Sequence, residues 1–472
     1  MGADQHGNPV TTTSHDAQSA FDEAVDHLLH FRPAVGDSVG DALDRDLTFA
    51  MAQVMSAYLS VLGTEPADAA AARQSLDAFE ASLDPGSLNP RERQHVAAAH
   101  ALVRGRLTTG GAILRDLTRD HPRDALALAV GHQVDFFTAD AVALRDRVGG
   151  ALSAWSAADP HYAVVLGMYA FGLEESGLYT RSEEVGLEAV ERDPADVWGM
   201  HAVAHTYEMQ GGFGRGVRFF DSRADAWQQG NFLNVHNWWH YCLYLLEAGD
   251  TARPLEIYDA VLDNVESAGL AMEMLDAAAL LWRLYLEGSD QSPRWTALAA
   301  SWDSAMVTPW YSFNDMHAVM SYVGAGRISD AERLVDARAR YVAEAEDPTV
   351  TNVAMAREVG LPVARAILAF GTGDYDRTVE LLLPIRSTVQ RFGGSHAQRD
   401  AVQRTLLEAA LRSGNHDLAR VLLSERLGIN PCSPYAWLKQ AALSTAVGDA
   451  ASAAVATGRA GSIRADAGVA VS

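Results

Sequence analysis

Two pairs of histidines in the middle of the chain have a spacing that places both members on one face of a helix. His201 and His205 are four residues apart, Glu208 continues their face, and His236 and His240 form a second pair. Imidazoles at this spacing can chelate a transition metal, and Glu208 could be a third ligand or an acid–base group. The alternative is that the histidines are hydrogen-bonded to neighbouring groups. The chain has no His-Glu-x-x-His sequence, so we favour hydrogen-bonded histidines and no cofactor, with a divalent metal as the alternative.

Other polar and aromatic residues could bind a ligand beside these histidines. Asp276 and Arg283 are seven residues apart on one expected helix face, and we favour a structural ion pair there over ligand binding. Trp238 and Trp239 cannot both face one side of a helix, and Trp239 is the better candidate for a groove. The remaining ligand-binding candidates are Glu174, Asp315, His317 and Arg399. Ser395 is a possible N-cap ahead of Arg399, whose guanidinium would suit a carboxylate.

Small residues recur along the chain at positions typical of turns between paired helices. The clearest are Gly105, Gly177, Gly211, Gly249, Gly326, Gly373, Gly414 and Gly448, and weaker copies lie near Ala139 and Gly288. Two of the steps between these residues are 34 residues long, which is the period of tetratricopeptide helix-turn-helix repeats. The sequence therefore predicts an all-α fold, an α-solenoid of tetratricopeptide-like repeats that forms a closed or strongly curved superhelix.

This repeat bears on whether the two histidine pairs meet. The second pair follows the first by 35 residues, close to one repeat, so regular stacking would place the pairs on neighbouring helices. Counting from the turns at Gly211 and Gly249 instead shifts the second pair by three positions within its unit. The sequence leaves open whether all four histidines converge.

The ends of the chain and its domain organisation follow from composition. We expect a disordered tail over residues 1–18, one helical repeat domain over residues 19–458, and a flexible tail over residues 459–472. No alternating run predicts a strand. The only cysteines, Cys242 and Cys432, exclude a disulfide framework or a cysteine-rich zinc site.

Six segments are polar and aromatic in ways that helical packing alone does not require. They are Gly167–Leu173, His201–Met209, His236–Leu245, Phe313–His317, Leu381–Arg386 and Gly393–Asp400. Together and in this order, over about Asp41 to Pro434, they resemble the tetratricopeptide repeat protein 38 family. The resemblance implies an all-α repeat fold and names no reaction or partner.

Charge and hydropathy narrow the possible partners. The formal charge is −24, so we expect neither a nucleic acid nor an anionic membrane surface as partner. No uninterrupted apolar run reaches the length of about 18 residues that spans a bilayer, and we expect a soluble, cytoplasmic protein.

Two functions fit these observations, and the sequence leaves open whether the protein is an enzyme. The first is a binding protein that holds a peptide or small ligand on a concave groove lined by His, Trp and acidic residues. The alternative is an enzyme with a central pocket that uses His201, His205, Glu208, His236 and His240 for acid–base or metal-assisted chemistry. A purely structural scaffold would not explain why polar groups cluster in the middle of the chain.

Overall fold

The computed structural model describes residues 2–84, 86–263, 269–305 and 308–471 of the chain. Within these residues the protein is helical throughout except for one short hairpin, which confirms the predicted all-α class. None of the helices in the described ranges is long and apolar enough to cross a membrane.

The helices follow one another with short connections. The first part contains β1 (Gly2–Ala3), β2 (Pro9–Val10), α1 (His15–Leu29), α2 (Val35–Arg45), α3 (Ala50–Leu62), α4 (Pro66–Ser82), α5 (Pro90–Leu102), α6 (Leu107–Asp120), α7 (Ala125–Phe137), α8 (Ala141–Ala151) and the 3₁₀ turn η1 (Leu152–Ala154). The middle contains α9 (Tyr162–Glu175), α10 (Tyr179–Arg192), α11 (Val197–Met209), α12 (Phe213–Asp221), α13 (Ala224–Trp227), α14 (Asn234–Ala248), α15 (Ala252–Ile257), the π-helical η2 (Tyr258–Leu262), α16 (Ala271–Leu286) and α17 (Ser292–Ala305). The last part contains α18 (Ser312–Gly324), α19 (Ile328–Glu344), α20 (Thr351–Met355), the π-helical η3 (Ala356–Gly360), α21 (Leu361–Gly371), α22 (Tyr375–Leu382), the 3₁₀ turns η4 (Leu383–Ile385) and η5 (Val389–Phe392), α23 (His396–Arg412), α24 (His416–Ile429), α25 (Pro434–Ala446) and α26 (Ala450–Ala467).

The predicted turn residues lie between helices and have left-handed backbone conformations. Every glycine named as a repeat anchor has a positive φ, and so does Ala139, whose φ is 47°. A left-handed residue ends a helix and satisfies its last carbonyls, which is why glycine is preferred there. The prolines at positions 122, 194 and 431 each follow a helix that ends two residues earlier, since proline disfavours a helical conformation in the residue before it. Gly216, five residues after the Gly211 turn, allows a close approach, because a Cβ there would lie 2.3 Å from the Tyr244 ring.

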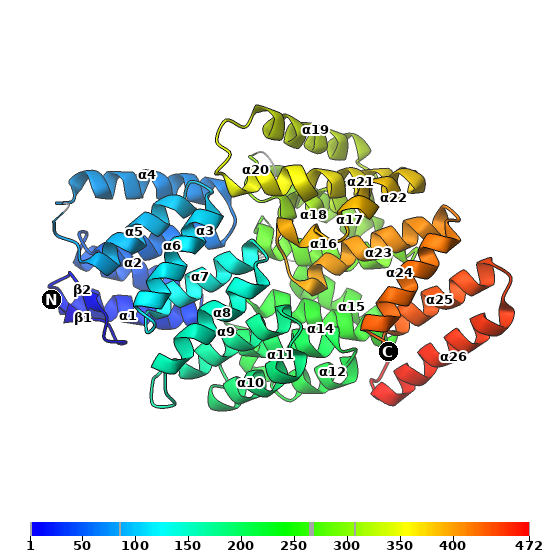
Figure 1. Cartoon of the computed structure of the whole chain (residues 1–472), viewed down its shortest axis with the longest axis horizontal. Helices are drawn as coiled ribbons and strands as arrows, with labels where there is room; N and C mark the ends of the chain where they lie inside the picture. Colours follow the sequence, from blue (N-terminus) through cyan, green and yellow to red (C-terminus); the bar gives the residue numbers. More distant parts are fainter. Residues whose placement is uncertain (1, 85, 264–268, 306–307, 472) are drawn as a thin grey trace.

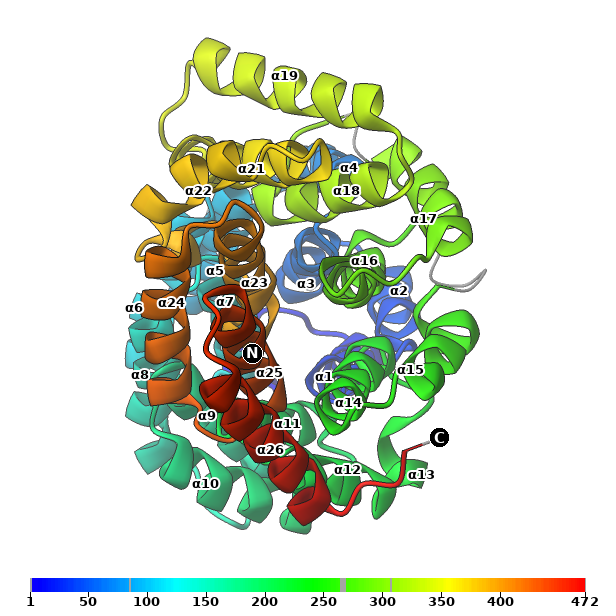
Figure 2. The same ribbon diagram turned by 90° about the vertical axis from the view of Figure 1, so that its right-hand side faces the viewer.

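Successive helices pack against each other along the chain, and distant helices also meet. Figure 1 shows the N-terminal helices at one end of the molecule and the C-terminal pair α25 and α26 at the other. In Figure 2, α10, α17, α19 and α24 lie at the periphery, and α3 and α16 lie nearer the middle. Helix α23 packs against α11 and α16, and α26 packs against α12 and α14. The C-terminal third therefore folds back onto the middle of the chain.

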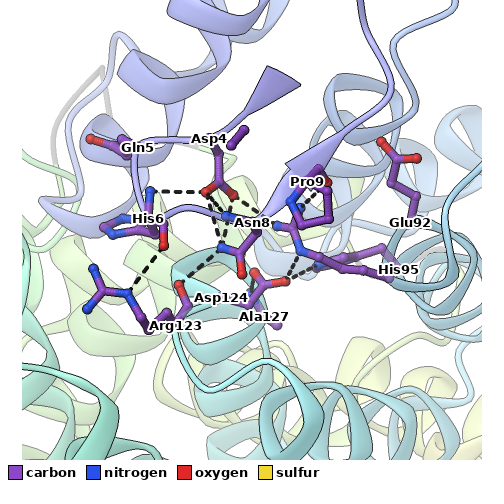
Figure 3. A network of polar contacts seen from close by, with 12 residues as sticks. Asp4, Gln5, His6, Asn8, Pro9, Glu92, His95, Arg123, Asp124 and Ala127 are labelled. Carbon is purple, nitrogen blue, oxygen red and sulfur yellow. Dashed lines mark hydrogen bonds and ion pairs between the residues drawn. The ribbon is translucent and has the colours of Figure 1, made fainter. Parts of the chain in front are cut away.

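The N-terminal segment is ordered where the sequence predicted a disordered tail and no strand. Strands β1 and β2 pair antiparallel, and Asp4, His6 and Asn8 in the turn between them are buried. The Asp4 carboxylate accepts hydrogen bonds from the Asn8 backbone at 2.8 Å and from the Arg91 guanidinium at 3.2 Å. Figure 3 shows Asp4 and Asn8 facing Asp124 at the start of α7. The segment folds because its polar groups pair with α5 and α7, which its own composition does not reveal.

The C-terminal segment also differs from the expectation of a flexible tail from residue 459. Helix α26 continues to Ala467, and Ala460 and Ile463 on it are buried. The Arg464 guanidinium donates to the backbone carbonyl of Glu247 at 3.0 Å and thereby ties α26 to α14. Residues 1 and 472, which the two predicted tails include, lie outside the described residues.

Candidate functional site

The four histidines converge inside the protein, and we call them the histidine centre. His201 and His205 lie on α11, His236 and His240 lie on α14, and these two helices pack against each other. One nitrogen of each imidazole lies within 4.8 Å of the corresponding nitrogens of the other three. The ring centroids of His205 and His240 are 4.3 Å apart, and those of His201 and His236 are 4.9 Å apart.

Local sequence features set the position of α11. The carboxylate of Asp196, directly before the helix, accepts a hydrogen bond from the backbone N–H of Gly199 at 2.8 Å and caps the helix. Gly199 and Gly167 leave room for this carboxylate, since a Cβ on either would lie within 2.4 Å of it. With the start fixed, the four-residue spacing directs both histidines of α11 toward α14.

Two carboxylates orient the histidines of α14. Asp276 on α16 lies 2.8 Å from Nδ1 of His236, and Glu208 on α11 lies 2.8 Å from Nδ1 of His240. A carboxylate on one ring nitrogen leaves the other nitrogen as a lone-pair donor, an arrangement that accompanies histidine ligands of metals. Nε2 of His240 is buried and has no hydrogen-bond partner among the described residues.

The two histidines of α11 have no hydrogen-bond partner among the described residues. Both ring nitrogens of His201 and both of His205 are buried without a partner in the described part of the chain. A carboxylate oxygen of Glu174, at the end of α9, lies 3.7 Å from Nδ1 of His205, which is too far for a hydrogen bond. Neither oxygen of Glu174 has another described partner.

Burial keeps these imidazoles neutral. It lowers the pKa of His205 to about 3 and lowers the pKa values of His201 and His240 well below the usual value. Burial also raises the pKa of Glu208 to about 8 and raises the pKa of Glu174 well above its usual value. Neutral imidazoles are the form that coordinates a metal.

The histidine centre fits a single transition-metal ion with a small adjustment. Nitrogen ligands lie about 2.0–2.1 Å from zinc, so two ligands of one ion are at most about 4.2 Å apart. The four nitrogens lie within 4.8 Å of one another, so no separation exceeds this limit by more than about 0.6 Å, which side-chain rotation can supply. The set of imidazoles with a nearby carboxylate is typical of zinc and other borderline divalent metals.

A second cluster of metal-ligating residue types behaves differently. Asp26, His30 and His161 also bring potential ligand atoms together. The ring nitrogens of His30 pair with the Asp26 carbonyl at 2.8 Å and with Asp193 at 2.9 Å. Those of His161 pair with Asp26 and His6. Both ring nitrogens of His30 and of His161 thus already have protein partners, unlike those of His201 and His205.

A cavity of about 620 Å³ adjoins the histidine centre. It lies between α11, α14, α16, α23 and α24, and its lining includes Glu208 and Arg283. Glu208 therefore joins the cavity to the centre, since the same carboxylate contacts His240. Trp239 stacks on His236 at a centroid distance of 5.3 Å, and the Arg283 guanidinium lies 5.2 Å from the Trp239 ring centroid.

The structure places several sequence candidates differently from expectation. The Asp276–Arg283 ion pair was predicted wrongly, because Asp276 bonds His236 and the Arg283 guanidinium donates to backbone carbonyls. Trp239 does face the site, yet it is fully buried and so lines no open groove, whereas Trp238 packs on Trp227.

The candidates on α18 and α23 have protein partners. Asp315 pairs with Arg338 at 2.8 Å, which accounts for its burial. His317 is buried, and its Nδ1 donates to the carbonyl of Phe313 at 2.9 Å. Arg399 does meet a carboxylate, that of Glu175 at 3.3 Å. The predicted Ser395 cap is confirmed, since its hydroxyl accepts from the backbone N–H of Gln398.

Sequence reasoning found Glu208 but missed Glu175 and Asp400, two further acidic residues that line the cavity. Glu175 contacts Arg399 and lies 3.3 Å from His396, and Asp400 pairs with Arg404 and Arg426. Glu175 could have been found from the sequence, because Glu174 and Glu175 are adjacent acidic residues at the end of an apolar helix. Asp400 gave no signal, because its partners lie on its own and the next helix. A comparison of the chain with protein-family models finds no match.

Proposed function

We propose that the protein is a metal-dependent enzyme that binds one divalent transition-metal ion at the histidine centre and acts on a small molecule in the adjoining cavity. The observation that carries this proposal is the convergence of buried imidazole nitrogens that have no hydrogen-bond partner among the described residues. Buried polar groups are nearly always paired, and each unpaired group costs about 1–3 kcal/mol. A bound ion would use several of them at once.

The carboxylates around the centre have separate tasks in this proposal. Asp276 and Glu208 hold the rings of His236 and His240 with their Nε2 atoms toward the other imidazoles. Glu174 is the nearest additional oxygen ligand, and it reaches the centre beside His205. Glu208 lies in the cavity wall and exchanges a proton with a molecule bound there. The metal, when bound, supplies a Lewis acid that stabilises negative charge developing on a substrate oxygen.

The helical arrangement is part of the same proposal. We infer that the helix pairs are tetratricopeptide-like repeats in a closed or strongly curved superhelix, and the resemblance to the tetratricopeptide repeat protein 38 family implies such a repeat fold. The left-handed turns at repeated positions support the inference, as does the packing of α23 against α11 and α16. The residues of the centre come from α11 and α14, which are first helices of neighbouring pairs in this scheme.

A peptide-binding groove is less compatible with the site. Trp239, His205 and His240 are fully buried, so a peptide could not lie against them without opening the helix pairs. A cavity of about 620 Å³ has the size of sites that hold a small molecule.

Metal analysis of the purified full-length protein tests the proposal. We expect about one zinc or other transition-metal ion per chain after reconstitution, and a visible absorption spectrum of nitrogen-coordinated Co²⁺ after substitution. His205→Ala should lower the affinity by about tenfold or more, since it removes one ligand.

His95→Gln is the matched control. His95 is equally buried but bonds Tyr58 and Asp124, far from the centre. It should leave the metal content of the folded protein unchanged. A wild-type protein without metal after reconstitution, or equal metal content in the His205→Ala variant, would contradict the proposal.

A further inference from the structure

Arg283 is a buried cation in the cavity wall, and no carboxylate of the described residues lies within ion-pair distance of it, although Asp400 and Glu208 are near enough to affect its pKa. Its side chain is 3% exposed, and no ion pair joins it to an acid of the described residues. Nη1 donates to the carbonyl of Ala279 at 2.9 Å, and Nη2 donates to that of Ala397 at 2.7 Å. Nε is buried and has no partner in the described part of the chain.

Burial of this charged guanidinium is energetically unfavourable unless an anion binds to it. Burial lowers the pKa of Arg283 to about 10, so the guanidinium is still charged at neutral pH. A buried charge without a counter-ion is among the least favourable features of a protein interior. The two carbonyls fix the guanidinium and leave three of its five N–H groups free.

The other arginines of the cavity differ from Arg283 because each already has a carboxylate. Arg386 pairs with Glu425 at 2.7 Å, Arg399 pairs with Glu175 at 3.3 Å, and Arg404 and Arg426 both pair with Asp400. Arg283 is thus the one arginine among the described lining residues whose charge is available to a ligand.

We infer that the cavity binds a small anionic molecule whose carboxylate or phosphate group is held by Arg283. Two parallel N–H donors of a guanidinium match two oxygens of either group. The inference names the substrate class of the proposed enzyme and so rests on that function, although the anion contact itself does not require the metal. A ligand anchored at Arg283 also reaches Glu208, because both residues line the cavity.

Titration calorimetry on the full-length protein, with and without metal, tests the inference. The probes are succinate and inorganic phosphate, with the uncharged diamide of succinate as the matched neutral probe. We expect the protein to bind one of the anions at millimolar concentration or below, and the diamide to bind about tenfold more weakly or not at all. The stronger of the two anions identifies the group as carboxylate or phosphate.

Two arginine variants locate the contact. Arg283→Gln should lower the affinity for the anion by about tenfold or more. Arg283→Lys should lower the affinity less, because lysine keeps the positive charge. Arg386→Gln is the control, since Arg386 lines the same cavity but is paired with Glu425. It should leave the affinity within about twofold.

The outcomes separate this inference from the proposed metal site. Anion binding by the metal-free protein that Arg283→Gln abolishes supports the inference, even if metal analysis contradicts the enzyme. Equal affinity for succinate and its diamide, equal binding by the Arg283→Gln variant, or no binding of either anion would overturn it. The comparison of charged and neutral probes uses the wild-type protein, so the test stands if Arg283→Gln does not fold.

Discussion

Two regions of the protein bury histidine side chains but differ in how the polar atoms of these histidines are satisfied. The N-terminal network consists of Asp4, Arg91, His95 and Asp124 and joins the first hairpin to α5 and α7 (Figure 3). Nδ1 of His95 pairs with the Tyr58 hydroxyl at 3.0 Å, and Nε2 pairs with Asp124 at 2.9 Å. The second oxygen of Asp124 accepts from the backbone of Ala127 and caps α7.

His201 and His205 of the histidine centre are equally buried but lack such partners among the described residues. His201, His205 and Glu174 have no hydrogen bond from their side-chain polar atoms to the described residues. The difference shows that burial alone does not distinguish a structural histidine from a functional one. What distinguishes them is whether the ring nitrogens are already used, since a fully paired network stabilises the fold and an unpaired one needs a ligand.

The largest effect is expected from Asp124→Asn in the N-terminal network. The substitution keeps the shape but removes the charge that compensates Arg91, which is 1% exposed. Breaking a buried pair in this way costs about 3–5 kcal/mol of the free energy of unfolding. Urea denaturation measures the change.

The control for this prediction is Asp116→Asn. Asp116 forms an exposed ion pair with Arg119, and its loss should cost less than about 1 kcal/mol. Equal effects of the two substitutions would mean that the N-terminal network contributes no more than a surface ion pair.

Zinc addition should stabilise the protein through the histidine centre and leave the N-terminal network unaffected. At a free Zn²⁺ concentration of about 100 times Kd, the free energy of unfolding should rise by about 2.7 kcal/mol. The His201→Ala/His240→Ala double variant should lose this increase, because it removes two ligands. The Asp124→Asn variant should show the same increase with zinc, although its free energy of unfolding without zinc is lower. An increase that persists in the double variant would place the ion elsewhere.

The features of these two regions that depend on local residue spacing could be predicted from the sequence. The left-handed turns follow from glycine positions, and the Ser395 cap follows from a four-residue pattern. Spacing also placed His201 with His205 and His236 with His240 on shared helix faces. Each of these features is decided within one helix or one turn.

The remainder depends on partners that are far away in the chain. Asp276 bonds His236 across 40 residues, and Arg91 bonds Asp4 across 87. Neither pairing follows from the helical period. The first depends on how α14 packs against α16, and the second depends on how the hairpin packs against α5. The expectation of a disordered N-terminal segment was wrong for this reason, as its polar residues are stabilised by distant charges.

Two helix-capping aspartates should show opposite pH dependence. Burial raises the pKa of Asp196 to about 7, whereas Arg91 and His95 hold the pKa of Asp124 well below its usual value. The protonated Asp196 contributes stability that is present below pH ~4 and is lost as the pH rises through 7. Asp196→Asn should therefore become more stable relative to the wild type with rising pH, by up to about 1.4 kcal/mol per pH unit between pH 4 and 7.

Asp124→Asn should give the reverse profile. The ionised Asp124 contributes stability that is present above its unfolded pKa and is lost at lower pH, so the deficit of the variant should shrink below pH ~4. Urea denaturation of the wild type and both variants over this pH range measures the profiles. Parallel profiles for the two variants would show that the cations beside Asp124 do not control its ionisation.

The smallest effect on stability is expected from Glu174→Gln in the histidine centre. Burial and the neighbouring Glu175 raise the pKa of Glu174 well above its usual value, which favours the neutral acid in the metal-free protein. The glutamine amide has nearly the same volume, so the substitution should change the free energy of unfolding by less than about 1 kcal/mol. This change is smaller than the one expected for the corresponding acid-to-amide substitution Asp124→Asn.

The zinc affinity of the Glu174→Gln variant tests whether Glu174 is a metal ligand. If Glu174 becomes a carboxylate ligand beside His205, Glu174→Gln should weaken Zn²⁺ binding by about tenfold or more while urea denaturation of the metal-free protein stays nearly unchanged. Competition with a chelator measures the affinity. Glu175→Gln is unsuited as a control because Glu175 pairs with Arg399, so Glu183→Gln, which alters an ion pair with Arg215 outside the cavity, serves instead. Unchanged zinc affinity in Glu174→Gln would restrict the ligands to the four imidazoles, and a large loss of stability without metal would mean that Glu174 is a structural acid like those of the N-terminal network.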